Sequence, residues 1–413
     1  MNYGTVLAAA FVLWPVMAVL GGQGFAPLLG LTGLAALFIA RPKMPPAIFA
    51  FIGFAFIAWA ALSELWTPGE TALISGSLLE NNFSVEARSV TAVLLALTSA
   101  LTIAATLRIE PAPRSSAVVA WMLIVQGVLV LVSAIASGQI VTALYGDDIR
   151  RHHEALQNYG RAANLLALSL PLLAPLLIVR WKLPGRLLAA VLVVAGAAAF
   201  LVLGSHSAFF ALFGTGAGIL IVRWLPRTGF RWLFGVIACY LSAAPMLYAV
   251  LIRALDPVAP NLSDSFRSRL WSWETVISRL PEAPLTGHGL NATRQWKDTF
   301  ESRPDWLMQL PGHWKDFPIV PGHPHNMALQ IWAETGLVGA VLAAMSLVAL
   351  SVRLPRPEEL RPEIRYATAG LAGAAIVIFS FSYSLWNEGF WSALALLVAA
   401  LILWSRSLKA PEA

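Results

Sequence analysis

Long apolar runs constrain the fold of this chain more than any other feature of its sequence. Hydrophobic residues occupy 58% of the 413 positions and charged residues only 12%, against roughly 25% charged residues in an ordinary soluble domain. Most of the length lies in segments that, as helices, are long enough to cross a bilayer core of about 30 Å. The sequence therefore predicts an all-α, polytopic membrane helix bundle with no room for a large soluble domain.

The apolar runs divide into about twelve predicted transmembrane helices. A long polar segment separates the ninth from the tenth, which predicts three parts: helices one to nine in residues 1–252, a large periplasmic loop with short helices in 253–324, and three last helices with a short cytoplasmic tail in 325–413. The spans are expected near residues 5–22, 25–40, 46–62, 89–107, 115–137, 162–179, 187–203, 207–222, 229–252, 326–350, 366–383 and 389–405.

The distribution of charge predicts how the bundle is oriented. The net charge of +6 is spread over many short connections, which favours orientation in a membrane and argues against nucleic-acid binding. With a cytoplasmic N-terminus every inner connection is basic, as the positive-inside rule requires. Both termini are then cytoplasmic and the large loop is periplasmic, in the inner membrane of a bacterium. The one cysteine, Cys239, excludes an intrachain disulfide and a cysteine-based metal site.

The junction between the large loop and the tenth span holds a pair of titratable side chains. His323 and His325 flank Pro324, which is expected to occupy the first turn of the helix. The positive end of a helix dipole favours the neutral, proton-accepting form of an imidazole. Polar residues at intervals of four predict one polar stripe on the following apolar helix. They are Asn326, Gln330 and Glu334.

The large loop is predicted to be structured. It contains five of the sixteen tryptophans, and a short helix over residues 267–280, capped by Ser265, would place one apolar side on the membrane surface or on the bundle. The tryptophans, Trp271 among them, suit either stacking on sugar rings or anchoring at the membrane interface. A turn rich in proline and glycine follows at residues 281–289.

Arginines at the outer ends of spans form a second group of candidates. Arg150 and Arg151 precede the sixth span, and Arg161 stands at its start. A positive residue in this place is disfavoured by topology, and guanidinium groups bind phosphates through paired hydrogen bonds. A diphosphate at the water line would suit this group, with Arg267 and Arg269 as a second clamp. For each single arginine, snorkelling or an ion pair is the alternative.

Two motifs flank the large loop. The first is an arginine followed after three residues by leucine. The second is His-Asn followed after nine residues by Gly-x-x-Gly. The residues that form them are Arg161 and Leu165, then His325, Asn326, Gly336 and Gly339.

This pattern, with twelve predicted spans and a large loop between the ninth and tenth, resembles the bacterial O-antigen ligase family. The resemblance implies a periplasmic-face glycosyltransferase, surrounded by membrane lipids, that moves a glycan from undecaprenyl diphosphate onto a sugar of lipid A core. His325 matches the essential histidine of the family and Arg161 the arginine of its first motif. The loop arginine is matched by either Arg267 or Arg269. Residues expected to bind substrate are Arg150, Arg151, His323, Asn326 and Trp271.

These residue types suit that chemistry. A neutral His325 can remove the proton of an acceptor hydroxyl as general base, and Arg161 with a loop arginine can stabilise the charge that develops on a diphosphate leaving group. No metal or other cofactor is then expected, and the sequence shows neither a P-loop nor an outer Asp-x-Asp. A single displacement would invert the anomeric centre.

Several alternatives stay open. A polymerase of the same superfamily would use the same donor, with two sizeable outer loops expected, and a protein O-glycosylating ligase would usually carry more sequence after the last span. A transporter or lipid flippase is the alternative of another class, although such carriers usually show two similar halves and mid-span charges. His323 and His325 with His152 or His288 could hold zinc. His288 and His313 are alternatives to His325 as base.

Overall fold

The structure is a computed structural model, and it describes residues 2–40, 42, 47–68, 74–75, 84–85, 87–109, 115–146, 149–299 and 317–408. For residues 47–51, 74–75, 84–85, 138, 141, 144–145 and 149–153 it describes the backbone alone. Two of the five loop tryptophans, Trp306 and Trp314, and the alternative base His313 lie outside the described residues.

The regular secondary structure of the described residues is helical apart from one pair of two-residue antiparallel strands, β1 (Ile74–Ser75) and β2 (Ser84–Val85), and an isolated bridge between Thr299 and Pro318. Short 3-10 helices lie at Glu64–Trp66, Asp256–Asn261, Leu280–Glu282, Ala292–Gln295 and Pro357–Glu359. The α-helices are α1 (Tyr3–Val19), α2 (Phe25–Ile39), α3 (Ala47–Ser63), α4 (Arg88–Thr106), α5 (Ser115–Tyr145), α6 (Ile149–Val202), α7 (His206–Trp224), α8 (Gly229–Leu255), α9 (Asp264–Arg279), α10 (Met327–Arg353), α11 (Pro362–Phe381) and α12 (Glu388–Ser407).

The predicted all-α membrane bundle is confirmed. In the described part of the chain, eight helices are long and apolar enough to cross a membrane, and three shorter apolar helices lie within the first 66 residues. One of the eight, α6, changes direction at Lys182, whose φ of 50° is not helical, and so contains both the sixth and the seventh predicted span. Each predicted apolar segment therefore overlaps a helix over most of its length.

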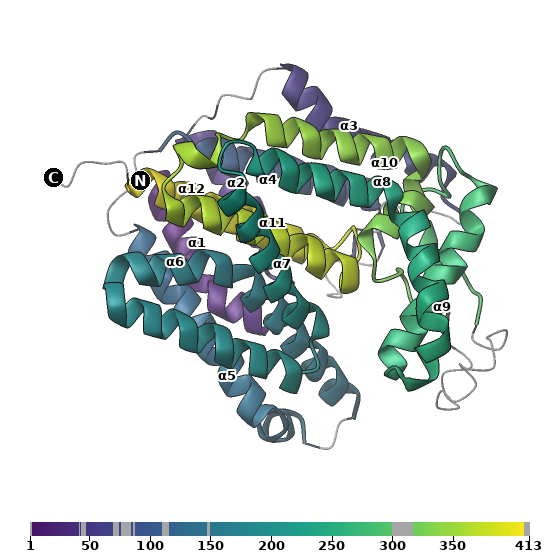
Figure 1. Ribbon diagram of the computed structural model, residues 1–413, viewed down its shortest axis with the longest axis horizontal. Coiled ribbons are helices and arrows are strands. Elements are labelled where there is room, and N and C mark those ends of the chain that lie inside the picture. Colours follow the sequence, from purple (N-terminus) through teal and green to yellow (C-terminus); the bar gives the residue numbers. More distant parts are fainter. Residues whose placement is uncertain are drawn as a thin grey trace.

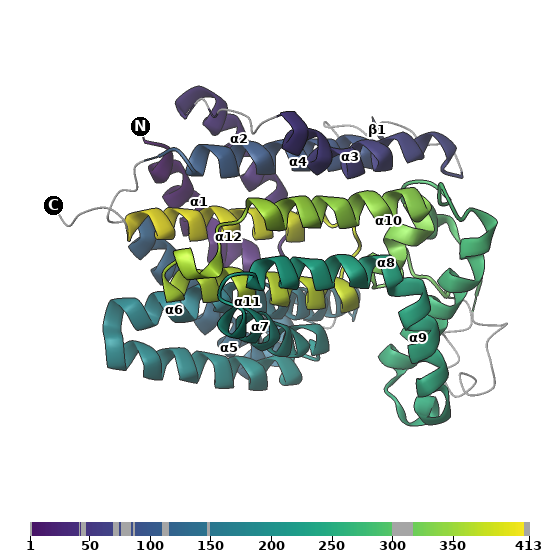
Figure 2. The ribbon, with the colours of Figure 1, turned by 45° about the horizontal axis from the view of Figure 1, so that its top comes forward.

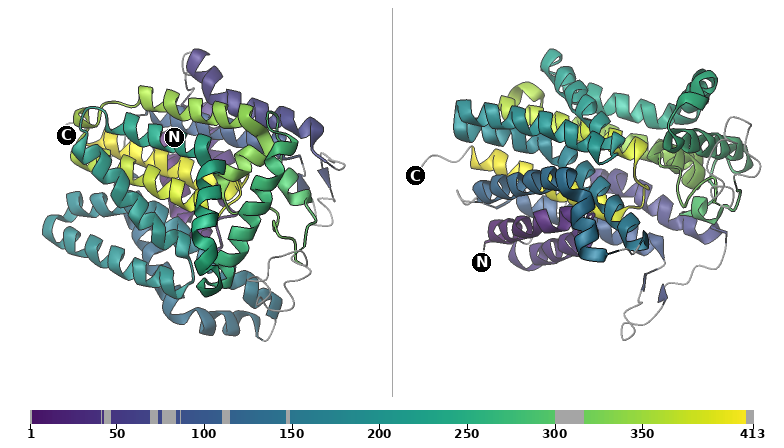
Figure 3. Two further views of the ribbon diagram at one scale, coloured as in Figure 1. Left: turned by 45° about the vertical axis from the view of Figure 1, so that its right-hand side comes forward. Right: turned by 90° about the horizontal axis from the view of Figure 1, so that it is seen from below.

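The bundle has two distinct ends. Both chain termini lie at one end, whereas α9 and the connections around it lie at the other (Figures 1 and 2). The strand pair also lies at the end of α9 (Figure 3). Helices α11 and α12 are the most enclosed of the candidate spans. Large apolar side chains such as Phe38, Ile135 and Val194 are exposed, as expected of helices that face lipid.

Helix α9 lies against the bundle and not free in solvent. Leu270, Trp273 and Val276 are buried on one side of it, and the Trp273 ring packs edge-on against Tyr248 of α8, with 4.8 Å between ring centroids. The helix begins at Asp264 after Ser263, so the prediction that Ser265 caps it was wrong. The first turn forms earlier because Asp264 pairs with a residue one turn later, an ion pair of the type that stabilises helix starts.

Helix α10 is interrupted where the Gly-x-x-Gly motif begins. Gly336 has a φ of 63° and a ψ of −164°, and the turn rich in proline and glycine docks into the break. Four backbone hydrogen bonds of 2.8 to 3.2 Å join the two segments. They run from the N–H groups of His288, Gly289, Leu337 and Val338 to the carbonyls of Ala333, Glu334, Pro284 and Leu285 respectively.

We expect Gly336→Ala to destabilise the protein by about 2 kcal/mol or more, because the left-handed backbone is unfavourable for alanine. A Cβ atom there would also lie 2.3 Å from the carbonyl oxygen of Leu285. The melting temperature in detergent measures the effect. The matched control is Gly216→Ala in α7, where a Cβ atom meets nothing within 4 Å. Equal melting temperatures for the two variants would contradict this role of Gly336.

Candidate functional site

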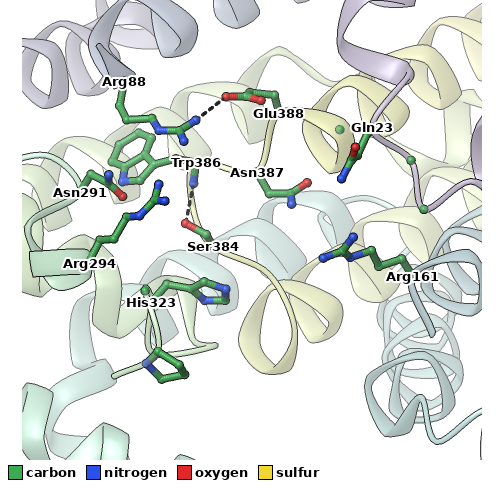
Figure 4. Close-up of a pocket in the computed structure, with 15 residues that line it drawn as sticks. Gln23, Arg88, Arg161, Asn291, Arg294, His323, Ser384, Trp386, Asn387 and Glu388 are labelled. Atoms are coloured by element: carbon green, nitrogen blue, oxygen red, sulfur yellow. Dashed lines mark hydrogen bonds and ion pairs between the residues drawn. The ribbon is translucent and has the colours of Figure 1, made fainter. Parts of the chain in front are cut away.

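A polar cavity of about 590 Å³ opens at the end of the bundle that carries α9. Its wall comes from six separate stretches of sequence, which meet only in the folded bundle (Figure 4). The lining residues are Gly21, Gly22 and Gln23 of the α1–α2 turn; Arg88 and Arg161; Asn291 and Arg294; Pro321, Gly322 and His323; and Ser384, Trp386, Asn387, Glu388 and Gly389.

Three guanidinium groups line this cavity against one carboxylate. Arg88 forms a 2.8 Å ion pair with Glu388, and Arg161 donates to the amide oxygen of Asn158 at 3.1 Å. The guanidinium group of Arg294 has no hydrogen-bond or ion-pair partner within the described part of the chain. Arg161 and Arg294 extend into the cavity from opposite sides (Figure 4). The excess of positive charge over negative suits an anion that carries at least two negative charges.

The two histidines are held in complementary tautomers. Nδ1 of His325 lies 2.9 Å from the carbonyl oxygen of Ser382, and because a carbonyl only accepts, this nitrogen carries the proton. Its Nε2 is then an acceptor, and it has no hydrogen-bond partner among the residues that the structure describes. The backbone N–H of His325 donates to Nδ1 of His323 at 3.1 Å, so the proton of His323 is on Nε2. The ring centroids are 4.2 Å apart. His325 can accept a proton, whereas neutral His323 can donate a hydrogen bond into the cavity.

Both imidazoles are held neutral. Burial, followed by the positive charge of Arg269, lowers the pKa of His325 to about 4. Burial, followed by His325 and Arg269, lowers the pKa of His323 well below its ordinary value. The predicted neutral form is therefore favoured, but for a different reason. The helix starts only at Met327, so the prediction that Pro324 occupies its first turn was wrong, and burial rather than the helix dipole dominates.

The backbone of His325 is strained and is fixed from several directions. Its φ of 51° lies in the left-handed region, which a residue with a bulky side chain rarely adopts. The Trp273 indole N–H of α9 donates to the carbonyl of the preceding Pro324 at 2.9 Å. Asn326 is the residue before α10, and its side chain accepts from the N–H of Leu329 at 3.0 Å. These bonds fix the backbone on both sides of His325 and so hold its imidazole in one position.

The connection between α11 and α12 links both motifs. The Ser382 carbonyl accepts from His325, while the Ser382 hydroxyl accepts from the Asn164 amide at 3.0 Å. Asn164 is one turn below Arg161 on α6. Leu165 is buried beneath the α1–α2 turn, 3.1 Å from the position that a Cβ atom on Gly22 would take. In the first motif, Leu165 therefore packs under the turn that lines the cavity, and Arg161 extends into the cavity.

A buried carboxylate ties the loop wall of the cavity to the α12 wall. Glu334 is fully buried in α10 and accepts four hydrogen bonds. Two come from the loop and one comes from its own helix, while the fourth comes from a tryptophan that lines the cavity. The donors are the Asn291 N–H at 2.9 Å, the Thr293 hydroxyl at 2.6 Å, the Gln330 amide at 3.1 Å and the Trp386 indole at 2.5 Å.

The predicted loop arginines and aromatic residue have separate environments. Arg267 is buried and pairs with Asp264, whereas the charge of Arg269 acts on both histidines. Trp271 is half-buried, and no partner for its indole N–H is found among the described residues. The Trp273 ring is 1% exposed and packs against the bundle, so it is not available to stack on sugars.

Other predicted residues stand apart from the cavity wall. The side chain of Asn326 is fully buried as a helix cap. Arg150, Arg151 and His152 have backbone in α6, and their side chains lie outside the described residues. His288 contacts the carbonyl of Arg279 through Nε2 at 3.1 Å and does not line the cavity.

Sequence reasoning missed Arg88 and Arg294. Arg88 is the first residue of α4, so the criterion that selected Arg161, a positive residue at the outer end of a span, also applies to it. Arg294 lies in a one-turn 3-10 helix of the loop. Its sequence context carries no signal of its own, because only the docking of the loop into the α10 break brings it to the cavity.

The fold and this cavity define a multi-pass helical membrane protein with a cationic site at one end of its bundle. Residues 155–344 match the O-antigen ligase family. The match includes α9, the described loop residues and both motifs.

Curated relatives of this chain also carry the name of polysaccharide ligases. Proteins named as candidate polysaccharide ligases in Rickettsia conorii, Rickettsia prowazekii and Rickettsia felis are 29%, 30% and 27% identical to this chain over 142 residues. The matched part covers 33% of this chain and 32% of each of these relatives. No solved structure matches the chain.

Proposed function

We propose that this protein is a glycosyltransferase that moves a glycan from undecaprenyl diphosphate onto a sugar of lipid A core, at the periplasmic face of the bacterial inner membrane. The proposal rests on one observation above all. The neutral imidazole of His325 has its Nδ1 fixed on a carbonyl, and its ring contacts that of His323, which lines a cavity together with three guanidinium groups. The match of residues 155–344 to the O-antigen ligase family supports the reaction class.

His325 is the proposed general base. Its Nε2 takes the proton of the acceptor hydroxyl while the hydroxyl oxygen attacks the anomeric carbon. The bond from that carbon to the phosphate oxygen breaks, and its electron pair leaves with the lipid diphosphate. One displacement of this kind inverts the anomeric configuration. His323 is assigned a different part, because its Nε2 carries a proton and can donate a hydrogen bond to the diphosphate or to the sugar.

The diphosphate is proposed to bind between Arg161, Arg294 and Arg88. Charge-assisted hydrogen bonds from guanidinium groups become stronger as negative charge develops on the leaving group. The charge of Arg269 lowers the pKa of both histidines, and we assign to it the role of keeping His325 unprotonated. Arg267 is assigned a structural part because its charge is met by Asp264.

The predicted orientation is supported by where the polar groups lie. The termini are at one end of the bundle and the cavity is at the other (Figure 3), so cytoplasmic termini would place the cavity at the periplasmic face. Polymerisation of a lipid-linked glycan uses the same donor chemistry and stays the second candidate. Mass analysis of the product distinguishes them, since a ligase lengthens lipid A core and a polymerase lengthens the lipid-linked glycan.

The pH dependence of transfer tests the identity of the base. Because the pKa of His325 is lowered to about 4, its Nε2 stays unprotonated down to weakly acidic pH. The rate is therefore expected to be nearly constant from about pH 8 to about pH 5 and to fall below that. A base with an ordinary imidazole pKa of about 6.5 would lose activity already near that pH. Single-turnover transfer in buffered proteoliposomes measures the profile, and a midpoint near 6.5 would contradict this environment for His325.

A further inference from the structure

An apolar groove of about 350 Å³ runs beside the polar cavity, between α3, α4 and α12. Helices α3 and α4 lie side by side next to α12 in the bundle (Figure 2). Side chains that line the groove recur at one-turn spacing on α4 and on α12. They are Phe56 and Ile57; Thr91, Ala92, Leu95, Ala96, Ser99 and Ile103; and Leu385, Trp386, Glu388, Trp391, Leu394, Ala395 and Val398.

The groove starts where the cavity ends. Trp386 and Glu388 line both, and Arg88, the cation paired with Glu388, begins the helix that forms the groove wall. The Trp386 ring stands between the two spaces, stacked on Phe56 with 6.5 Å between centroids and fixed by its bond to Glu334. From this polar end, the lining residues of α4 extend for about 18 Å along the helix axis, at 1.5 Å per residue.

A molecule that fits both spaces has a doubly charged head and a long apolar tail. Another apolar pocket is lined by residues of α8, α10 and the loop and shares no residue with the polar cavity. It therefore offers a tail no continuous path from the guanidinium groups. Helices α4 and α12 both start at the cavity and run toward the opposite end of the bundle (Figure 2), which is the direction that a lipid tail takes into a bilayer.

We propose that this groove binds the first isoprene units of the polyprenyl chain whose diphosphate occupies the cavity. The assignment rests on the proposed function and adds the path of the donor lipid through the protein. Thr91 and Ser99 are the only hydroxyl side chains in the wall, and the rest of the groove beyond Glu388 is apolar. An apolar wall provides no hydrogen-bond partners for sugar hydroxyls, so the glycan is expected to extend on the loop side of Arg161 and Arg294.

Photo-crosslinking tests the assignment in full-length protein reconstituted in phospholipid vesicles. The probe is a polyprenyl diphosphate with a diazirine on an isoprene unit near the head. Labelled peptides are expected to come from α3, α4 and α12, and unlabelled polyprenyl diphosphate should compete whereas excess vesicle phospholipid should not. Labelling elsewhere, or equal competition by phospholipid, overturns the proposal.

A matched pair of substitutions on α4 adds a kinetic test. Ala96 lines the groove and Leu97 is 41% exposed on another face of the helix. Ala96→Trp is expected to raise KM for the polyprenyl-linked donor about tenfold or more with little change in kcat, as loss of uniform binding requires. Leu97→Trp should leave KM unchanged. A donor with a short, water-soluble prenyl chain should be used equally by both variants.

The outcomes separate the groove from the proposed function. If the donor KM is equal for the two tryptophan variants, the groove is not the lipid site, and glycan transfer by the wild type still supports the proposed activity. If the groove is labelled specifically but the wild type transfers no glycan, the proposed activity is wrong and the assignment of the lipid site is retained. If Ala96→Trp does not fold, Ser99→Phe fills the same groove one turn further on.

Discussion

Replacing His325 with asparagine is expected to lower the rate of glycan transfer by about 10²- to 10⁴-fold, the usual contribution of a general base. Asparagine tolerates the left-handed backbone found here, with a φ of 51°, and its amide can donate to the Ser382 carbonyl as Nδ1 does now. It has no equivalent of the free Nε2. The variant therefore removes the base while it preserves the local structure.

The comparison with two other variants makes this prediction sharp. His325→Ala should be equally inactive but less stable, because alanine is unfavourable at this φ and leaves the Ser382 carbonyl without its donor. His288→Asn is the matched control, since that ring packs against Trp296 and contacts the Arg279 carbonyl rather than the ring of His323. Initial rates and melting temperatures are measured in parallel. Transfer by His325→Asn within threefold of the wild type would remove the imidazole from the mechanism.

Arg161→Lys is expected to lower kcat/KM for the donor by about 10- to 100-fold although the charge is kept. A guanidinium group can hold two phosphate oxygens at once, whereas an ammonium group acts as a point charge. Arg161 already extends into the cavity from α6, fixed by Asn158. A lysine there would have to place its charge without that support.

Controls for Arg161→Lys come from both ends of the bundle. Arg294→Lys should show a loss of similar kind, because that side chain faces the same space. Arg227→Lys should have no effect, because its side chain is 80% exposed in the connection between α7 and α8. Steady-state kinetics with varied donor concentration provide the measurement. An unchanged kcat/KM for Arg161→Lys would show that the diphosphate does not contact this residue.

Local sequence rules were sufficient for the helices and for the position of the histidine pair. Apolar runs predicted each candidate span, because in a membrane the length of a run determines whether it crosses. The same rules misplaced both helix starts near the site. Asn326, not Pro324, precedes the first turn of α10, and Ser263, not Ser265, precedes α9, because several consecutive residues were acceptable as caps.

The cavity could be predicted only in part because long-range docking assembles it. Arg161 and His323 were selected from sequence and do line it. Arg294 and Trp386 reach it because Glu334 binds the loop and the start of α12 together, and no local pattern reports that contact. Gly336 shows the same limit: its motif was visible, but the reason for a glycine is the backbone that docks against it.

Reconstitution with defined substrates tests the central claim most directly. Purified protein in vesicles is supplied with a polyprenyl diphosphate-linked glycan of known anomeric configuration and with lipid A core, without added metal, and the linkage in the product is determined by NMR. We predict that the wild type transfers the glycan to lipid A core with inversion and that His325→Asn does not. A product with retained configuration, or equal transfer by His325→Asn, would contradict the proposed role of the imidazole beside the three arginines.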